Sequence, residues 1–400
     1  MWWAGPMATT ALADLGAEVI KVEAVQRLDG WRGALAGHTG SQRTYETSPV
    51  FNALNRNKLG LTLNLNSREG ATIFRRLVTM SDVVCENYSA RVMGQFGLDY
   101  PSLRKLQPDI VMVSLSGFGR TGPCRDYVAF AATAEASSGI VALTGYPGGP
   151  PLMSGTILGD PVPGMFCALA TASALEYRRR TGRGQWVDVS QVEAATWGIT
   201  DALLEYQLTG RLPGRRGNRH PSLAPHDVYR CKGDDEWVAI AIATDEEWKR
   251  LCQVLARADL EANSRYASAR ARRRNEAALR VPIEEWTRQH DKFEAARILQ
   301  EVGIAAGAVQ NPADLLHDPH LEHRGYFQTL ERREVGTHPY PAPVPSFADV
   351  PRQIRLPAPC LGEHRQWVLG DLLGLSSEYL ADLEREHTTG TSPLTAPPLR

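Results

Sequence analysis

The chain has 400 residues, which is enough for two or three domains with well-buried cores. Its content of 43% hydrophobic and 22% charged residues is ordinary for a globular protein, and its net charge of -1 gives no basic field that would hold nucleic acid. No apolar run is long enough to span a membrane, and the first residues lack the basic and apolar regions of a signal peptide. The six cysteines lie far apart without a Cys-x-x-Cys pair, so we expect reduced thiols in a cytoplasmic protein.

The first part of the chain alternates between helical and extended patterns. Helices are predicted at 8–16 and 67–80, and strands at 17–22, 59–65, 82–86 and 110–115. Strands separated by helices indicate a parallel α/β sheet, which binds ligands at the carboxyl ends of its strands. We therefore expect function in the turns that begin at Glu23, Asn87 and Ser116. A doubly wound sheet normally opens with a strand, so we expect that a first strand is missing before the first helix.

The second part of the chain suggests a separate middle domain. Helices are predicted at 164–178, 191–208, 245–255, 366–373 and 377–385, and strands at 186–190 and 237–243. Residues 211–225 are rich in Arg, Gly and Pro and have no period, so we interpret them as a linker. The segment 341–359 is extended and proline-rich, which is typical of a chain crossing back to its first domain. The tail 388–400 is predicted to be disordered.

One carboxylate, Asp160, lies between Gly159 and Pro161, directly before an apolar run at 165–175. An acid with Gly before it and Pro after it does not fit the middle of a helix. From this segment alone, a helix N-cap is the more common role for such a residue. A carboxylate that projects into a site is the alternative.

Three further groups suggest chemistry but admit simpler interpretations. A glycine-rich turn follows the strand at 110–115, but Pro123 interrupts the helix that a dinucleotide fingerprint requires. Three histidines at three-residue spacing could bind a metal, although a solvated loop is favoured: His317, His320 and His323. An arginine-rich run fits a phosphate site and a solvated linker equally well: Arg215, Arg216 and Arg219. The pair Trp2–Trp3 fits the core or a ligand wall.

Many short motifs occur together in one order along the chain. They include Ala4–Pro6, Leu12–Glu23, Asn55–Lys58, Glu86–Tyr88, Ser116–Gly119, Gly159–Asp160, Arg180–Gln185, Gly217–Pro221, Asp318–His320 and Leu361–His364. In this order they resemble the family III CoA-transferases, the CaiB/BaiF group. The resemblance runs from Met1 to about Leu383.

The resemblance implies an α/β fold with a Rossmann-like large domain built from both chain ends and a smaller α+β domain from the middle. The large domain would comprise 1–210 and 331–387, and the small domain 226–330. Two copies of such a chain interlock, so a homodimer is expected, and a mixed dimer with a related chain is the alternative.

The resemblance also assigns the chemistry. The catalytic aspartate of the family matches Asp160, which would attack an acyl-CoA thioester, form a mixed anhydride and then an aspartyl-CoA thioester, and pass CoA to a carboxylic acid. One thioester replaces another, so neither a metal nor a redox nucleotide is implied; the partners are acyl-CoA and a small carboxylic acid. Active-site neighbours would be Gly159, Phe130, Trp3 and Gly217.

The CoA contacts follow by the same resemblance. Trp2, Trp3 and Ala4 would line the pantetheine and acyl end, and the adenosine part would lie against Leu63, Asn64, Leu65, Asn66, Asn87, Tyr88 and Ser89. The thioester would lie beside Val128, Ala129 and Phe130. Basic residues that hold the CoA phosphates in relatives are absent from the matching positions, and Arg91 or Lys58 are candidates to replace them.

Activities other than CoA transfer are the alternatives for this sequence. The α-methylacyl-CoA racemases of the same family need a histidine about thirty residues before the aspartate as a second acid–base group, and Phe130 stands at that position. A subunit of a heteromeric CoA-transferase is a further alternative. A nicotinamide dehydrogenase is excluded because no strand-to-helix turn carries the phosphate-binding glycines. The bulk of Trp2–Trp3 predicts a hydrophobic acceptor acid, with succinyl-CoA or acetyl-CoA as the donors suggested by the family.

Overall fold

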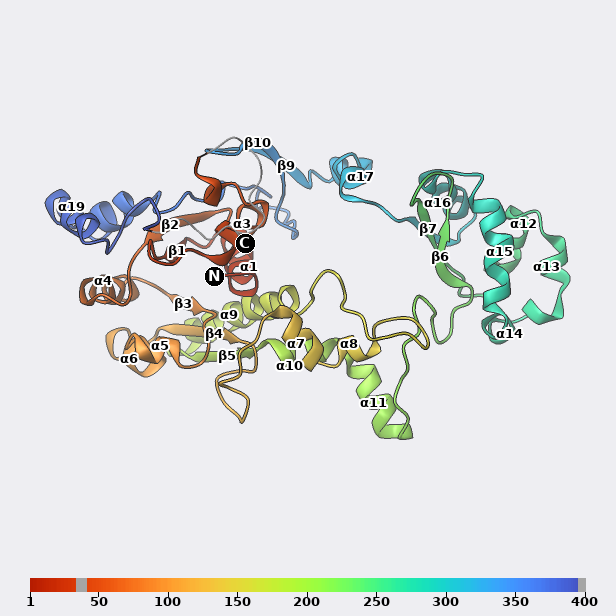
Figure 1. Cartoon of the computed structure of the whole chain (residues 1–400), viewed down its shortest axis with the longest axis horizontal. Coiled ribbons are helices and arrows are strands. Elements are labelled where there is room, and N and C mark those ends of the chain that lie inside the picture. Colours follow the sequence, from red (N-terminus) through yellow and green to blue (C-terminus); the bar gives the residue numbers. More distant parts are fainter. Residues whose placement is uncertain (34–41, 395–400) are drawn as a thin grey trace. The chain divides into compact units, whose positions relative to one another are not determined.

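The computed structural model of the chain describes residues 1–33 and 42–394 (Figure 1). The chain divides into two compact units. Unit 1 consists of Met1–Val141, Met153–Gly210 and His320–Arg400, and unit 2 of Ala142–Leu152 and Arg211–Pro319. Helices and strands alternate in both, which is the mixed α/β fold that the sequence predicts. Among the described residues, no helix has both the length and the apolar character needed to cross a bilayer.

Unit 1 contains two groups of parallel strands. β1 (Val19–Glu23) pairs with β2 (Lys58–Thr62), and β4 (Val111–Ser116) lies between β3 (Val83–Glu86) and β5 (Trp186–Ser190). Every residue of β4 is buried, as expected of a central parallel strand. The single parallel sheet predicted from the sequence is not observed, because no described strand connects β1 to β3 by hydrogen bonds.

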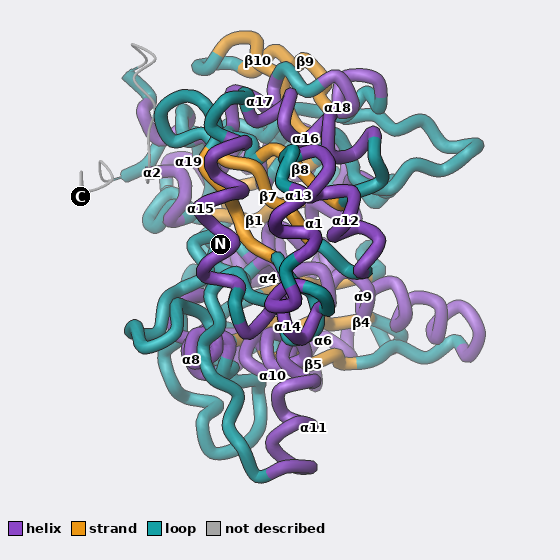
Figure 2. Tube along the Cα trace, turned by 90° about the vertical axis from the view of Figure 1, so that its right-hand side faces the viewer, coloured by secondary structure: helices purple, strands orange, loops and turns teal. Residues whose placement is uncertain are grey.

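The helices of unit 1 cover these strands. α9 lies against β4 and β5 and also against α1 (Figures 1 and 2). The helices in this part of the chain are α1 (Ala4–Asp14), α2 (Gly30–Gly33), α3 (Pro49–Leu54), α4 (Arg68–Val78), α5 (Val92–Gln95), α6 (Tyr100–Leu106), α7 (Ala131–Ser137), α8 (Ile140–Leu143), α9 (Pro161–Thr181), α10 (Gln191–Thr196), α11 (Thr200–Thr209) and α19 (Ser377–Arg385).

The continuous helix predicted at 191–208 is wrong. α10 ends at Thr196, a 3-10 turn spans Trp197–Ile199, and α11 begins at Thr200. Gly198 lies in the middle of this break, where its high backbone entropy disfavours the α-helical conformation.

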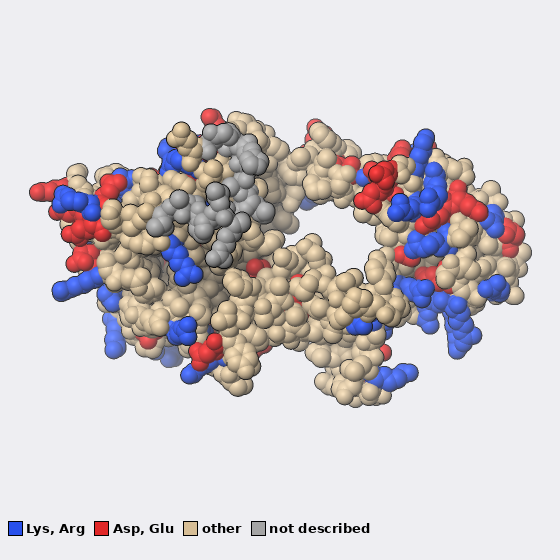
Figure 3. All heavy atoms as spheres, in the orientation of Figure 1, with Lys and Arg blue, Asp and Glu red and all other residues tan. Residues whose placement is uncertain are grey.

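Unit 2 is built on an antiparallel sheet in which β7 (Trp237–Ala241) lies between β6 (His226–Arg230) and β8 (Ala305–Ala308). Val238 and Ile240 of β7 are buried in its apolar core. Its helices are α12 (Asp245–Val254), α13 (Ala258–Ala262), α14 (Ala269–Arg274), α15 (Glu276–Thr287), α16 (Lys292–Glu301) and α17 (Pro312–Leu316), followed by α18 (Pro319–His323) at the boundary. Basic and acidic side chains are interspersed over this unit on the face seen in Figure 3, so that face has no field of a single sign.

The chain returns to unit 1 through an antiparallel hairpin of β9 (Phe327–Arg332) and β10 (Gly336–Pro341), which the sequence patterns did not indicate. The predicted closing helices are confirmed, the first as a π-helix over Gln366–Leu372 and the second as α19.

The predicted disorder of 388–400 is wrong for residues 388–394. Thr388 and Thr389 are buried, and the backbone of Thr388 and the side chain of Thr389 bond to Asn64 and Thr62 at the end of β2. These hydrogen bonds offset the loss of chain entropy that a polar tail would otherwise retain. Residues 395–400 lie outside the described residues.

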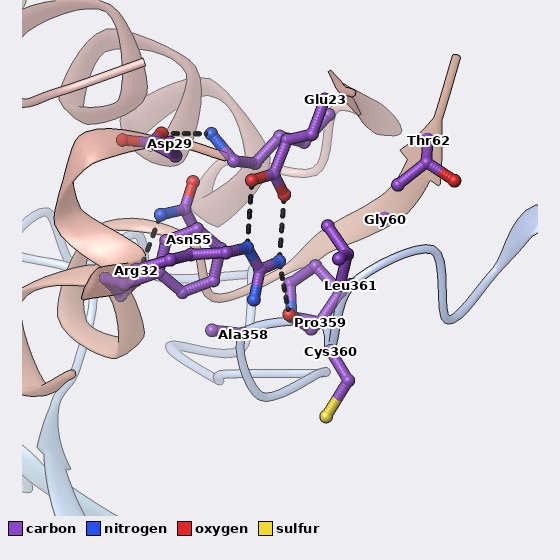
Figure 4. A network of polar contacts seen from close by, with 12 residues as sticks. Glu23, Asp29, Arg32, Asn55, Gly60, Thr62, Ala358, Pro359, Cys360 and Leu361 are labelled. Atoms are coloured by element: carbon purple, nitrogen blue, oxygen red, sulfur yellow. Dashed lines mark hydrogen bonds and ion pairs between the residues drawn. The ribbon is translucent and has the colours of Figure 1, made fainter. Parts of the chain in front are cut away.

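A buried ion network fastens the first part of unit 1 to the returning chain (Figure 4). Arg32 in α2 is fully buried and donates two hydrogen bonds of 2.8 Å to the carboxylate of Glu23, at the end of β1. It also donates to Glu46 at 2.7 Å and to the carbonyl of Pro359 at 3.2 Å, and Arg332 of β9 binds the same Glu46 at 2.9 Å. Burial opposes ionisation of Glu23, but the charges of Arg32 and a neighbouring lysine outweigh it and lower the pKa of the Glu23 carboxyl.

Candidate active site

Asp160 occupies the N-cap position of α9, but its side chain accepts no capping hydrogen bond. Its backbone is helical (φ -111°, ψ -54°) rather than extended, as a capping residue normally is. Pro163, at the third helical position, has no N–H for a capping carboxylate, and the N–H of Val162 at the second position donates to the Leu158 carbonyl at 3.4 Å. Asp160 therefore stands at the N-cap position, as the sequence suggested, but it does not make the capping hydrogen bond. Its carboxylate is left available for chemistry.

Gln191 holds one oxygen of this carboxylate. Its amide nitrogen lies 2.5 Å from Oδ1 of Asp160 and 3.0 Å from the carbonyl oxygen of Gly159, and donates a hydrogen bond to each. Gln191 is the first residue of α10, directly after β5, and is buried. The bond therefore links the ends of two elements that pack together, α9 and α10.

Burial raises the pKa of the Asp160 carboxyl from 3.8 to about 6, and the hydrogen bond from Gln191 opposes this rise. No cationic side chain contributes to the shift. Asp160 is thus a half-buried carboxylate whose ionised form is weakly solvated, which makes it more reactive towards an electrophile than a carboxylate in water.

Two glycines allow the Asp160 loop to approach the segment before α7. A Cβ atom on Gly159 would lie 2.2 Å from the carbonyl oxygen of Ala131, and one on Gly117 would lie 2.3 Å from Cβ of Ala129. Larger residues at either position would force the backbone apart. This close packing brings Phe130, the residue before α7, to the Asp160 loop.

Aromatic side chains form a cluster around Phe130. Its ring packs edge-on against Trp2 at 5.7 Å, Trp2 against Trp31 at 5.7 Å, and Trp31 against Trp3 at 6.1 Å. Asp29 accepts hydrogen bonds from the backbone N–H groups of Trp2 and Trp31, at 2.9 and 3.2 Å. Phe130 is 59% exposed and Trp2 is 40% exposed, so this cluster offers an apolar surface to a ligand.

The start of α1 lies against the first turn of α9. A Cβ atom on Gly164 would lie 2.9 Å from the carbonyl oxygen of Ala4, so the two helices are in contact one turn beyond Asp160. Trp3 immediately precedes α1. Of the site residues predicted from the sequence, the structure therefore brings Asp160, Gly159, Phe130, Trp2, Trp3, Ala4 and Ala129 into one region.

Asn87 also belongs to this region. A Cβ atom on Gly5 would lie 2.7 Å from the side-chain amide of Asn87, so the turn after β3 packs against the start of α1. In the same turn Tyr88 stacks edge-on against Phe96, and Ser89 and Arg91 are exposed. Val128, two residues before Phe130, is 79% exposed.

The adenosine contacts predicted at 63–66 follow a different strand, β2. Leu63 is 1% exposed and lies in an apolar core with Leu61, and its N–H already bonds to the Glu23 carbonyl. Its side chain therefore offers almost no surface to a ligand, and its role as a CoA contact stays a prediction. Asn64 and Leu65 are half-buried and Asn66 is exposed, so these three stay predictions.

Lys58 is not a phosphate ligand in this structure. It is 1% exposed, and its three N–H donors are taken by the carbonyls of Pro6 and Leu54 and the side chain of Asn55, at 2.8, 2.9 and 3.1 Å. Burial lowers the pKa of the Lys58 ammonium well below its usual value. Arg91 remains as the candidate that faces solvent.

Gly217 and the arginine run lie in unit 2. Gly217 has a positive φ of 61° and packs against Tyr146. Arg215 donates to the carbonyls of Gly149 and Ala142, and Arg219 lies 3.8 Å from Glu276. Within residues 1–33 and 42–394 no group of three or more His, Cys, Asp and Glu side chains is arranged to hold a metal, the histidines at 317–323 included.

Two residues of this region, Gln191 and Trp31, were not among the site residues predicted from the sequence. Gln191 follows strand β5, whose carboxyl end lies in register with that of β4, so the rule that pointed to Asn87 and Ser116 would also have pointed to Gln191. Nothing in the sequence pattern singles out Trp31, because its position beside Trp2 depends on the tertiary contacts that fix α2.

A parallel α/β core, a lone carboxylate at the start of a helix and an apolar surface beside it are the features that the resemblance to CoA-transferases predicts. The profile of CoA-transferase family III matches residues 1–365. The chain belongs to this family, as its motifs indicated.

Known relatives agree with this assignment. The chain is 34% identical over 381 residues, 95% of its own length and 93% of the relative's, to a succinyl-CoA–D-citramalate CoA-transferase of Chloroflexus aurantiacus. It is 31% identical over 383 residues, 95% of the chain and 93% of the relative, to the beta subunit of a succinyl-CoA–L-malate CoA-transferase of the same organism. The crystal structure of a CaiB/BaiF family protein from Brucella suis superposes with a TM-score of 0.83 at 31% identity, covering 92% of this chain and 96% of that one. Transfer of CoA between an acyl-CoA and an acid is thus the class of activity to which the chain belongs.

The raised pKa of Asp160 predicts how stability depends on pH. Because the folded pKa, about 6, exceeds the unfolded value near 3.8, the folded chain binds the extra proton between these values, and wild-type stability falls as pH rises through that window. Asp160→Asn removes the charge, so it should melt like the wild type below pH 4 and be more stable by about 2 kcal/mol above pH 7. Thermal unfolding across this pH range measures the difference. The exposed Asp126→Asn is the control, and a pH-independent difference for Asp160→Asn would contradict the buried environment.

Proposed function

We propose that the chain transfers CoA from an acyl-CoA donor to a carboxylic acid acceptor through covalent intermediates on Asp160. The observation that carries this proposal is a half-buried carboxylate that begins α9 without capping it. Asp160 attacks the thioester carbonyl and displaces CoA thiolate, which leaves a mixed anhydride. The thiolate then attacks Cγ of Asp160 and expels the donor acid, which leaves an aspartyl-CoA thioester. The acceptor carboxylate reverses these steps and departs as the new acyl-CoA.

The remaining predicted residues have binding roles in this proposal. Trp2, Trp3 and Ala4 line the pantetheine and acyl end, and the exposed segment 128–130 lies beside the thioester. The turn from Asn87 to Ser89 and the residues Asn64 and Asn66 flank the adenosine, and Arg91 supplies charge for the phosphates. Apolar walls around the thioester exclude water, which would otherwise hydrolyse the anhydride. Gly217, which belongs to unit 2, is given no role in this proposal.

We propose that the acceptor is a hydrophobic acid. The support is the aromatic cluster, in which Phe130 and Trp2 present exposed apolar faces next to the Asp160 loop. The relatives compared above are named for citramalate and malate, which are small polar acids. In this proposal the cluster is what separates the present chain from those relatives. Succinyl-CoA, named as the donor for both of them, is the first donor to try.

The catalytic proposal predicts a covalent adduct on one residue. After incubation with succinyl-CoA, the wild-type chain should gain the mass of CoA less one water on the peptide that contains Asp160. Asp160→Asn keeps the shape of the side chain and should form no adduct, with transfer reduced at least about 10⁴-fold. Intact-protein and peptide mass spectrometry measure both. Exposed Asp126→Asn is the matched control and should load normally; an adduct or substantial transfer in Asp160→Asn would contradict the assignment.

The acceptor proposal predicts a selective effect at Phe130. Phe130→Ala should lower kcat/KM about tenfold for a phenyl- or cyclohexyl-bearing acid and change it little for succinate, because only the bulky acid uses the aromatic face. Tyr127→Ala is the control, since Tyr127 is also exposed but packs against Phe118. The test measures kcat/KM for a panel of acceptor acids with one acyl-CoA donor. Equal use of a small diacid and all bulky acids by the wild type would remove the proposal.

We further propose that two copies of the chain associate. The supporting observation is that large apolar side chains of α9, the 3-10 turn and α11 in unit 1 are exposed. Leu169 is 64% exposed, Trp197 70% and Leu208 84%. Isolated chains seldom leave so many large apolar side chains in water on neighbouring helices. A related chain is the alternative partner, since one relative is named as a beta subunit.

The association proposal predicts the molar mass in solution. The wild type should elute at twice the chain mass of 44.0 kDa in size exclusion with light scattering. The double change Leu169→Glu with Trp197→Glu should give monomers, because it places charge among these exposed apolar side chains. Tyr379→Glu, on α19, is the control. A wild-type chain that stays monomeric at micromolar concentration would speak for a different partner.

A further inference from the structure

The orientation of the Gln191 amide is fixed by its surroundings. Its terminal nitrogen lies within hydrogen-bond distance of two acceptors, Oδ1 of Asp160 and the carbonyl oxygen of Gly159. The reverse orientation would set the amide oxygen against two other oxygens and leave both acceptors without a donor. Gln191 therefore presents N–H to the carboxylate, and the ionised acceptor makes this hydrogen bond stronger than one between two neutral groups.

The two oxygens of Asp160 are consequently different. Among the residues that the structure describes, the carboxylate has one hydrogen bond, and Oδ1 receives it. Oδ2 is left to attack the thioester, so Oδ2 becomes the bridging oxygen of the anhydride and Oδ1 its carbonyl oxygen. We propose that Gln191 is a catalytic residue, whose amide N–H stabilises the negative charge that forms on Oδ1 each time Cγ of Asp160 is attacked. This inference rests on the proposed function of Asp160 as nucleophile.

Charge forms on Oδ1 twice in the reaction. When CoA thiolate bonds to Cγ of the anhydride, the carbonyl electron pair moves onto Oδ1, and the adduct collapses by expelling the donor carboxylate with Oδ2 in it. When the acceptor carboxylate bonds to Cγ of the aspartyl-CoA thioester, the pair again moves onto Oδ1, and collapse expels CoA thiolate. No proton or co-reactant is needed in either step. In the first and last steps the attacked carbon belongs to the acyl group of the substrate, so the charge forms on the substrate oxygen and not on Oδ1.

The donor is held in place before the charge appears, which is the condition for electrostatic stabilisation to lower a barrier. The backbone on both sides of Gln191 is fixed: Ser190 caps α10 by accepting from the N–H of Glu193, and the N–H of Val192 donates to the Gly117 carbonyl at 3.0 Å. The bond from Gln191 to the Gly159 carbonyl holds its amide in line with Oδ1. Little reorganisation is therefore required when Oδ1 becomes an oxyanion.

The experiment separates the steps in which Cγ is attacked. The aspartyl-CoA thioester is formed with succinyl-CoA, freed of ligand by rapid desalting, and mixed with the acceptor acid. Its decay is followed by quenching and intact-protein mass spectrometry. Gln191→Leu, which has no donor, should discharge the thioester about 10²–10³-fold more slowly than the wild type, the loss typical of one oxyanion donor. Steady-state kcat should fall similarly while KM for the acyl-CoA changes only a few-fold.

Two further variants make the result decisive. Gln191→Met keeps the approximate length of the side chain but offers no hydrogen-bond donor to Oδ1, so it should be about as slow as Gln191→Leu while keeping the wild-type melting temperature within a few degrees. Glu193→Gln changes an exposed residue of the same helix and should discharge at the wild-type rate.

The outcomes distinguish this inference from the proposed function. If the wild type loads on Asp160 and Gln191→Leu or Gln191→Met discharges within about threefold of its rate, the role of Gln191 is overturned and Asp160 stands. A loss that appears only in KM also overturns it, because a donor to the oxyanion acts on the chemical step. If the wild type forms no adduct on Asp160, the proposed function fails, and the role of Gln191 fails with it.

Discussion

The rest of unit 1 depends on one interaction, a buried network of ion pairs between two arginines and two glutamates at α2. Arg32 joins Glu23 at the end of β1 to Glu46, and Glu46 is shared with Arg332, which arrives almost three hundred residues later in the chain. All four side chains are buried, so loss of one partner would leave an unpaired charge in the interior, at a cost of about 3–5 kcal/mol. Leu361 and Pro359 of the returning chain bind the same groups through their backbone, so the network fastens both ends of the chain together.

This network also positions the aromatic cluster around Phe130. Trp31 directly precedes Arg32 in α2, and Asp29, the residue before α2, binds the N–H groups of Trp2 and Trp31. Lys21 of β1 balances the buried charge of Asp29 at 2.7 Å. A set of buried polar contacts therefore sets the shape of an apolar surface that, in the proposed function, a ligand touches.

The site combines the aromatic cluster with tight backbone contacts. Gly159 and Gly117 let the Asp160 loop, the start of α7 and the start of α10 meet without intervening side chains. The histidine that a racemase would need is replaced by Phe130, and the neighbouring carboxylate Glu135 is fully buried with Oε1 bound to the N–H of Ser154. Glu135 thus helps to hold the segment that leads to Asp160, and the arrangement favours acyl transfer over proton transfer at both faces of a carbon atom.

The sequence by itself determined most of the helices and strands, the α/β class and the family, because these depend on local periodicity, on β-rich runs and on motifs read in order. It also singled out Asp160, since a carboxylate between Gly and Pro is unusual wherever it lies. Only the tertiary structure decided that Asp160 does not cap α9, that Lys58 and Leu63 are enclosed, and that Gln191 and Trp31 belong to the site. Each of these depends on which segments meet in space, and such contacts are set by buried charges and close backbone packing between residues far apart in the chain, which no local pattern records.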